Sequence, residues 1–434
     1  MAAVLEKLFG LQKSGTSVRQ EALGGFTTFL AMSYLVFVVP SMLADAGMDR
    51  QAAVAATIFV TVVASLVMGL WANLPIAVGP GLGVSAYFAY YVCGPAGFTW
   101  QAALAAVFIS GVVFFVLTVS RVRELIIDAI PPDLKVATTV GIGCFIALIG
   151  MKNCGLIVNA PDMGLALGNV KSPEVLIAVT GFFATAFLMV HRVSAAVIIG
   201  ILFTGLLSFV FGTAKAPESW IALEAPDITK NFLVLDFAGA LSHGLATIVF
   251  TLTVVDLFDN IGSLIGLSRK AGYIEPDGSI RNLGRAFMTD SFGTMFSGIM
   301  GTSTAVQYLE SATGIAAGAR TGLSTVFVAL FFAATFVFIP LVSAVPTSAT
   351  APALVIVGVL MMQEVRHIHF ENLRIAIASF LMIVAMPWTF NIATGFGFGF
   401  IAYVLLTLAV GRWREISFVS YCICAAFALN FALR

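Results

Sequence analysis

The chain consists largely of apolar runs of about 20 residues, separated by short polar stretches. A helix of that length rises far enough to cross the hydrocarbon core of a bilayer. Hydrophobic residues make up 60% of the sequence and charged residues only 10%, whereas about a quarter of the residues of a soluble domain are charged. We therefore predict an all-α polytopic membrane protein.

The apolar runs predict fourteen spans in two sets of seven, with a more polar stretch at 213–240 between the sets. The first set lies near 22–41, 53–73, 79–93, 101–120, 134–151, 174–191 and 194–212. The second set lies near 241–267, 286–300, 303–317, 320–342, 349–363, 371–390 and 394–411. A last run, 416–432, is either an additional span or an interfacial helix.

The basic residues indicate the orientation. With a cytoplasmic N-terminus, the outer loops contain only Arg50, Lys152, Lys171, Lys215 and Lys230. The inner loops contain the larger set: Arg121, Arg123, Lys135, Arg192, Arg269, Lys270, Arg281, Arg285, Arg320, Arg366, Arg374, Arg412 and Arg414. This asymmetry follows the positive-inside rule. Residues 1–21 lack the apolar core of a secretory signal, so we expect them to be retained in the cytoplasm.

The two sets of spans resemble each other weakly. The third segment of each is short and interrupted by glycines, at Gly79–Val92 and Gly301–Gly314. Because each set contains an odd number of spans, the second must insert upside down relative to the first. Inverted repeats with interrupted segments at matching positions are typical of transporters that bind substrate near the membrane midplane.

Both interrupted segments predict backbone that lines a cavity, because irregular backbone is tolerated in lipid only where protein buries it or a cavity meets it. Gly79-Pro80-Gly81-Leu82-Gly83 cannot remain a regular helix, so we predict an extended stretch that leads into a half-helix whose N-terminal amides, near Val84 and Ser85, face a substrate. The matching break lies at Gly301, Thr302 and Ser303, and a packing surface of small residues remains the alternative for both segments. Phe88 or Tyr87 could stack on a ring.

Three carboxylates lie inside apolar runs, where a charge is costly and usually functional: Asp256, Asp259 and Glu310. Asp256 and Asp259 share one helix face, and we expect Glu310 about two turns into the second half-helix. A carboxylate can accept two adjacent N–H donors, as on a purine or pyrimidine edge. We interpret these side chains as holding a polar substrate and a proton, with a structural pairing role as the alternative for Asp256. For Asp290 we expect a pairing with Arg285 or Lys270.

Several functions are disfavoured. The five cysteines and four histidines have no metal-binding or redox spacing. No basic cluster with interleaved aromatics suggests nucleic-acid binding. Neither a hydrolase or protease motif nor a phosphate loop is present, so neither an enzyme nor an ATP-driven pump is predicted. An anion exchanger would need cationic lining, and a channel would conduct without saturating.

Four motifs stand out along the chain: the opening Gly15–Tyr34, D-L-F-D-N-I-G-S-L-I-G (Asp256–Gly266), the loop Ala271–Ile280, and Y-L-E-S-A-T-G (Tyr308–Gly314) continued to Leu323. In this order they resemble the AzgA-like purine permeases of the nucleobase:cation symporter-2 family. The resemblance extends from about Leu8 to Arg414.

The resemblance implies fourteen spans as an inverted repeat of seven and seven. Its core domain would comprise 22–120 and 241–342, and its gate domain 121–212 and 343–411, with 412–434 as a C-terminal segment. It implies proton-coupled uptake of purine bases across a bacterial inner membrane by elevator-like movement of the core against the gate. It also implies a possible homodimer, and no cofactor other than the proton.

By this resemblance, Asp259 and Glu310 bind the base and couple the proton. One departure is Gly83-Val84-Ser85-Ala86, where the family commonly has G-L-N-A with an asparagine that recognises the base. The shorter Ser85 leaves the choice among purines open, and we favour guanine and hypoxanthine over adenine. A uracil or xanthine permease on the same fold is the main alternative.

Overall fold

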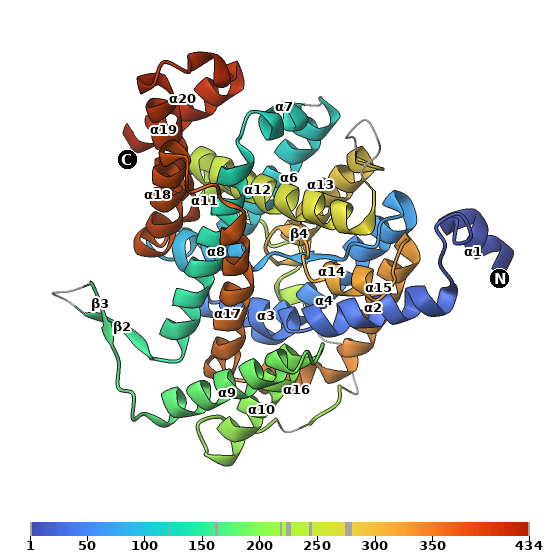
Figure 1. Cartoon of the computed structure of the whole chain (residues 1–434). Coiled ribbons are helices and arrows are strands. Elements are labelled where there is room, and N and C mark those ends of the chain that lie inside the picture. Colours follow the sequence, from blue (N-terminus) through green and yellow to red (C-terminus); the bar gives the residue numbers. More distant parts are fainter. Residues whose placement is uncertain are drawn as a thin grey trace.

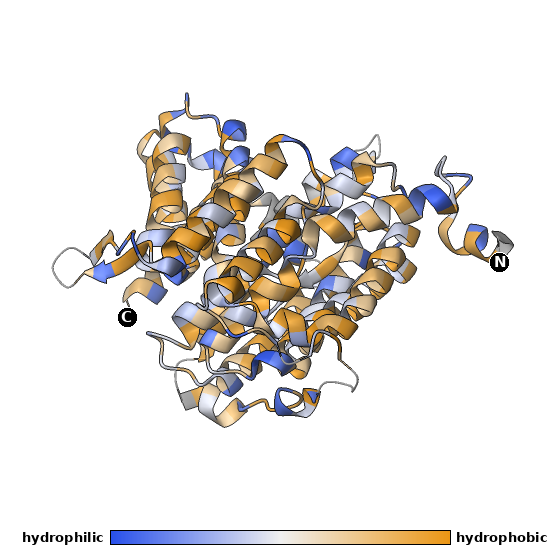
Figure 2. Cartoon of the chain, turned by 90° about the horizontal axis from the view of Figure 1, so that it is seen from below, coloured by the Kyte–Doolittle hydropathy of each residue, from blue (hydrophilic) through white to orange (hydrophobic). Residues whose placement is uncertain are grey.

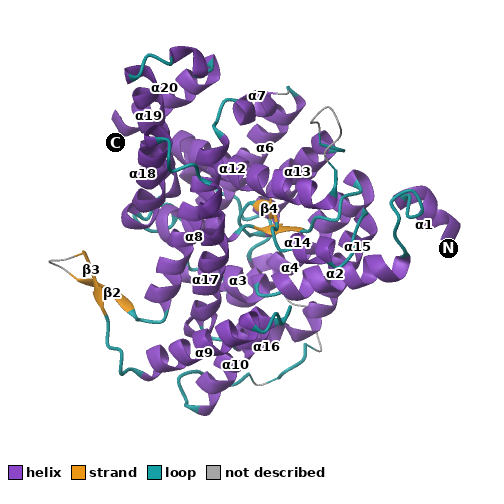
Figure 3. Ribbon diagram, in the orientation of Figure 1, coloured by secondary structure: helices purple, strands orange, loops and turns teal. Residues whose placement is uncertain are grey.

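The computed structural model describes residues 2–120, 122–160, 164–217, 219–222, 227–242, 245–273 and 280–432. Within these residues the chain is mostly helical, with two short pairs of strands (Figures 1 and 3). A helix, or a strand followed by a helix, lies at each range where the sequence predicts a span. The loop motif at Ala271–Ile280 falls mostly outside the described residues.

The first half of the chain contains α1 (Ala2–Phe9), α2 (Val18–Met32), α3 (Leu35–Asp45), α4 (Arg50–Val67), η1 (Met68–Ala72), β1 (Val78–Pro80), α5 (Leu82–Tyr87), η2 (Phe88–Val92), α6 (Trp100–Val119), α7 (Val122–Asp128), α8 (Pro132–Asn153), β2 (Ile157–Ala160), β3 (Gly164–Leu167), α9 (Pro173–Val190) and α10 (Ala196–Val210). The second half contains η3 (Ile228–Lys230), α11 (Phe237–Ser242), α12 (Leu245–Ala271), α13 (Leu283–Met300), β4 (Ala305–Gln307), α14 (Ser311–Ala316), α15 (Gly322–Ala334), η4 (Thr335–Phe338), α16 (Ile339–Ala344), α17 (Thr347–Met362), η5 (Gln363–His367), α18 (Leu373–Thr389), α19 (Ile392–Ala409), η6 (Trp413–Glu415) and α20 (Phe418–Ala432).

Short polar side chains fix where several long helices begin. Asp49, Thr99, Ser172 and Asn391 each accept a hydrogen bond from the amide three residues ahead. Such a cap satisfies one of the N-terminal amides that a helix leaves without an internal partner. The polar loops between apolar runs thus define the helix ends locally.

Eight helical segments among the described residues are long and apolar enough to cross a membrane. Figure 2 shows that apolar residues cover most of the helical ribbon. The first of these segments consists of two helices, because α2 ends at Met32 and α3 begins at Leu35. The break places Tyr34 in the interior of the protein, where only 1% of its surface is exposed.

The long helices pack in two groups. The first helix group comprises α2, α3, α4, α6, α12, α13, α14 and α15, in which α13 packs along α6 and α15 packs along α2 and α4. The second helix group comprises α8, α9, α10, α17, α18 and α19, in which α17 and α18 both pack along α8. The groups meet where α8 touches α5 and α12, and where α17 touches α3.

The two interrupted segments cross at the centre of the first helix group, where β4 is labelled in Figure 1. β1 pairs with β4 in antiparallel register, with Gly79 opposite Val306. We call β1 with α5 the first crossing segment and β4 with α14 the second crossing segment. The predicted extended stretch is confirmed for Gly79–Gly81, because β1 ends at Pro80 and Gly81 caps α5 in an extended conformation. Its expected continuation through Leu82 and Gly83 is wrong, since both residues already lie in α5.

Candidate functional site

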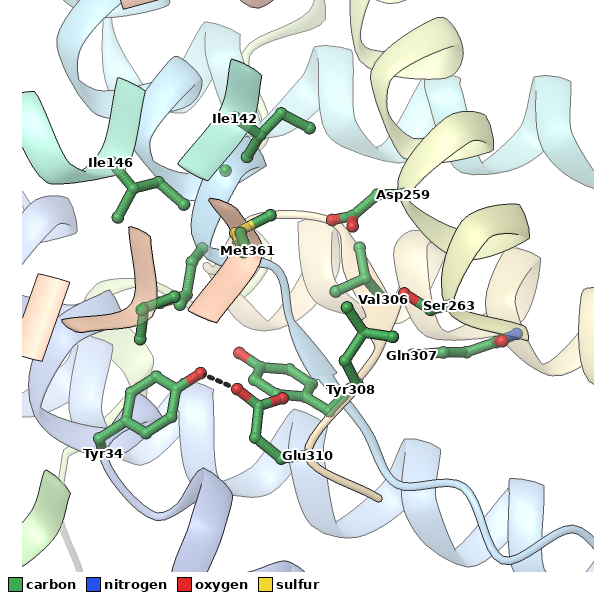
Figure 4. A pocket seen from close by; sticks show the side chains of 14 residues that line it. Tyr34, Ile142, Ile146, Asp259, Ser263, Val306, Gln307, Tyr308, Glu310 and Met361 are labelled. Carbon is green, nitrogen blue, oxygen red and sulfur yellow. Dashed lines mark hydrogen bonds between the residues drawn. The ribbon is translucent and has the colours of Figure 1, made fainter. Parts of the chain in front are cut away.

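A cavity lies beside the crossing, between the two helix groups (Figure 4). The first helix group and the crossing segments contribute Tyr34, Leu82, Gly83, Asp259, Ser263, Val306, Gln307, Tyr308, Leu309 and Glu310. The second helix group contributes Ile142 and Ile146 from α8, and Val357 and Met361 from α17. Each wall therefore belongs to a different packing unit, and a relative movement of the units would change access to the cavity.

Two carboxylates, Asp259 and Glu310, line this cavity, and no basic side chain is among its described lining residues. Asp259 projects from α12, whereas Glu310 lies just before α14. The expected position of Glu310 two turns into the half-helix is wrong. The extended backbone continues through Gln307, so the helix begins only at Ser311 and Glu310 is its N-cap residue.

Glu310 is held by a tyrosine that sequence reasoning missed. Tyr34 lies in the break between α2 and α3, and its hydroxyl donates a hydrogen bond to Oε1 of Glu310 (Figure 4). The polar Ser33-Tyr34 pair within an apolar span is the local signal that could have drawn attention to Tyr34.

A second tyrosine ties the two crossing segments together. The Tyr308 hydroxyl donates to the carbonyl oxygen of Pro80 at 2.5 Å, and the Tyr308 amide donates to the carbonyl of Ala77 at 3.0 Å. Pro80 has no amide hydrogen, so its carbonyl is the only backbone group it offers to a partner. Tyr308 thus positions its own segment, which carries Glu310, against the first crossing segment.

Asp256 does not line the cavity but supports β4 from behind. Its Oδ1 accepts from Asn260 Nδ2 at 2.8 Å, and its Oδ2 accepts from Thr294 Oγ1 at 3.3 Å. Asn260 Oδ1 in turn accepts from the amide of Gln307 at 2.9 Å. These contacts agree with the alternative stated above for Asp256, a structural pairing role.

The remaining predicted site residues are buried behind the cavity lining rather than in it. Ser85 donates to the Gly81 carbonyl at 2.6 Å and lies 2.5 Å, Oγ to Oγ, from Ser303. The Ser85 amide also bonds to Gly81, so it is not free for a ligand. Val84, Phe88, Thr302 and Ser303 are each 0% exposed.

Asp290 pairs with neither Arg285 nor Lys270, so that expectation is wrong. Its Oδ2 accepts from Arg123 at 2.6 Å, and both side chains are fully buried. The guanidinium of Arg123 also stacks over the rings of Phe114 and Phe287, at 4.8 and 4.0 Å. A lone buried charge is costly, so the ion pair ties α7 to α13.

The apolar spans, the crossed half-helices and the acidic cavity define a multi-pass membrane transporter rather than an enzyme. Residues 19–426 match the profile described as "Permease family". The chain belongs to this family, and the resemblance to purine permeases of the nucleobase:cation symporter-2 family is confirmed.

Three curated relatives illustrate the match. A putative permease of Methanocaldococcus jannaschii is 44% identical over 98% of both chains. The adenine permease AdeQ of Escherichia coli is 38% identical over 100% of this chain and 97% of its own. The guanine/hypoxanthine permease PbuO of Bacillus subtilis is 39% identical over 94% of this chain and 96% of its own.

Among solved structures, the fold resembles the transmembrane domain of the cyanobacterial bicarbonate transporter BicA. The TM-score is 0.65 at 14% identity, covering 89% of this chain and 97% of that domain. At this identity the likeness concerns the fold alone.

Proposed function

We propose that this protein is a secondary active transporter that couples a proton to the uptake of purine nucleobases, with guanine and hypoxanthine preferred over adenine. The observation that carries this proposal is a cavity lined by two carboxylates and, among the described residues, by no basic side chain. Such a cavity favours N–H donors and protons and repels anions. The named adenine and guanine/hypoxanthine permeases among the relatives support the same substrate class.

Glu310 is the residue that we propose to recognise the base. Tyr34 occupies Oε1 of Glu310, so the other oxygen is the one proposed to accept an N–H of the ring. Guanine and hypoxanthine both present an N–H on the six-membered ring, which adenine lacks. Leu82, Val306 and Ile142 provide apolar walls for a flat ring.

Asp259 is the residue that we propose to couple the proton. It lines the same cavity as Glu310, so the two negative charges repel each other there. A proton on Asp259 removes that repulsion and favours entry of a neutral base. Asp256 lies behind Asp259 and is a second candidate for the proton, through its bond to Asn260.

We further propose the fourteen-span inverted repeat, with the first helix group in the core domain (22–120 and 241–342) and the second in the gate domain (121–212 and 343–411). The antiparallel pairing of β1 with β4 supports the inverted relationship. The cavity lined from both groups supports elevator-like movement of the core against the gate. A bacterial inner-membrane location, a cytoplasmic N-terminus and a homodimer remain part of this proposal.

The BicA-like fold raises an anion exchanger as the competing function, which the acidic cavity disfavours. The test is uptake of labelled hypoxanthine into proteoliposomes with and without an inward proton gradient. Unlabelled guanine, adenine, xanthine, uracil and bicarbonate serve as competitors. Saturable, gradient-driven accumulation blocked by guanine but not by uracil or bicarbonate is expected. Inhibition by uracil alone would instead identify a pyrimidine permease. Uptake that does not depend on the gradient would exclude proton coupling.

A further inference from the structure

A second cavity lies on the outer face of the first helix group and shares no lining residue with the candidate site. Its walls are Val67 and Trp71 at the end of α4 and in η1, Phe115 of α6, and Met288, Phe292 and Met295 of α13. All six side chains are apolar, and its volume is about 280 Å³. The rings of Trp71, Phe115 and Phe292 are 39% to 45% exposed. We call this feature the outer groove.

The apolar surface continues beyond the outer groove along α4. Phe292 stacks on Phe296 with ring centroids 5.7 Å apart, and Phe296 contacts Phe59 at 5.8 Å. Phe59 is itself 38% exposed. From Phe59 to Trp71 the helix rises by roughly 18 Å at 1.5 Å per residue, close to the depth of one leaflet, about 15 Å. The stripe therefore has the length of one acyl chain.

A positive charge marks one end of the stripe. Arg285 lies one turn before Met288 on α13, in line with Met288, Phe292 and Met295. Arg285 is exposed, and its Nη1 donates to the carbonyl of Trp71 at 3.3 Å. The other guanidinium nitrogens of Arg285 make no hydrogen bond to a described residue. A tryptophan at the end of a span is typical of the headgroup level, which places Arg285 at phosphate depth.

We propose that the outer groove binds an anionic glycerophospholipid, with one acyl chain along the stripe and the phosphate on Arg285. A zwitterionic lipid fills the same apolar space, but its cationic headgroup gains less from the guanidinium. The groove is linked to the candidate site through α13, because another face of that helix packs on β4, which contributes Val306 and Gln307 to the site. Thr294 Oγ1 donates to the Ala305 carbonyl at 3.4 Å. A bound lipid thus contacts a helix that supports the crossing.

Trp71 is a built-in reporter for this proposal. Brominated acyl chains quench tryptophan fluorescence on contact. The chain has five tryptophans, so the quenching that is lost in Trp71→Phe gives the contribution of Trp71 alone. The purified full-length protein is reconstituted with increasing fractions of brominated phosphatidylglycerol or brominated phosphatidylcholine. We expect half-quenching of Trp71 at about fivefold lower mole fraction of phosphatidylglycerol. Equal fractions for the two lipids would overturn the proposal.

The matched variants are Arg285→Gln and Arg366→Gln, since both arginines are exposed and Arg366 lies on η5, away from the groove. The preference for phosphatidylglycerol should disappear in Arg285→Gln and persist in Arg366→Gln. If Arg285→Gln does not fold, the same quenching is measured on the unmodified protein at low and high salt, because ionic strength screens an exposed charge pair. A preference that is unchanged between low and high salt contradicts the proposal. This readout needs no nucleobase, so it is independent of the proposed transport.

Discussion

The two crossing segments are antiparallel counterparts, yet they contribute different chemistry to the cavity. In the first, only Gly81 separates β1 from α5, and the lining residues Leu82 and Gly83 have no charge. In the second, the turn Tyr308–Glu310 separates β4 from α14 and brings a carboxylate to the cavity. The first segment thus supplies close backbone approach, and the second supplies the charge. The two paired segments thus contribute differently to one cavity.

The largest effect on substrate affinity is expected from the second crossing segment, which carries the charge of Glu310. Glu310→Gln replaces a charged acceptor by an amide, and hydrogen bonds to charged groups contribute about 1.5–3 kcal/mol. Affinity for guanine should therefore fall roughly 10- to 150-fold, as measured by equilibrium binding to the purified protein. Glu364→Gln, at a half-exposed carboxylate that bonds His367, is the control. Unchanged affinity in Glu310→Gln would place recognition elsewhere.

Asp259→Asn should separate binding from coupling. Base exchange across the membrane without a gradient is expected to continue, since Glu310 is intact. Accumulation driven by a proton gradient should be lost, because an amide cannot carry the proton. The measurement compares the two fluxes in the same proteoliposomes. Retained accumulation would move the coupling role to Asp256, for which Asp256→Asn is the next variant.

The uncharged segment is tested by adding a methyl group. In Gly81→Ala the new Cβ would lie 2.7 Å from Cγ1 of Val306, within the crossing itself. In Gly83→Ala it would lie 2.6 Å from Cγ2 of Ile142, across the interface between the two helix groups. Overpacking of this kind costs about 1–3 kcal/mol, so thermal unfolding should shift to lower temperature in both.

Second-site truncations distinguish these two glycines. Val306→Ala should restore stability to Gly81→Ala but not to Gly83→Ala, and Ile142→Ala should do the reverse. Rescue of both variants by either truncation would mean that the crossing and the interface are not separate contacts.

The smallest effect is expected at Ser85. Ser85→Ala removes a hydroxyl that bonds Gly81 and touches Ser303, at a cost of about 1 kcal/mol of stability. Because Ser85 does not line the cavity, the order of affinity among guanine, hypoxanthine and adenine should stay the same. A changed order in a competition assay would return Ser85 to direct base recognition.

Local chemistry explains which features could be predicted. Proline lacks an amide hydrogen and glycine favours broken backbone, so the residues of Gly79–Gly83 themselves predict a break in the helix, although the helix already resumes at Leu82. The carboxylates stand out against apolar neighbours, and Asp259 and Glu310 do meet in one cavity. The continuation of extended backbone to Gln307 was not predictable, because it depends on pairing with β1 and on the amide bond to Asn260.

Long-range partners explain the rest. Asp290 lies 167 residues from Arg123, and Tyr34 lies 276 residues from Glu310. Spacing along one helix can suggest only partners that are close in sequence, such as Arg285 for Asp290. Pairings between distant helices follow from packing, which a single sequence does not display.

The crossing also has a consequence for the order of assembly during synthesis. Tyr308 donates to Pro80 across 228 residues of chain, which take roughly 10 to 45 s to synthesise at about 5–20 residues per second. Through that interval the extended backbone of β1 has no β4 to satisfy it, and lipid offers no hydrogen bonds in its place. The first crossing segment must therefore stay in a protected or hydrated setting, such as the insertion machinery, until the second crossing segment has been synthesised. A nascent chain stalled before β4 should accordingly keep β1 accessible to water-soluble thiol labelling at an introduced cysteine.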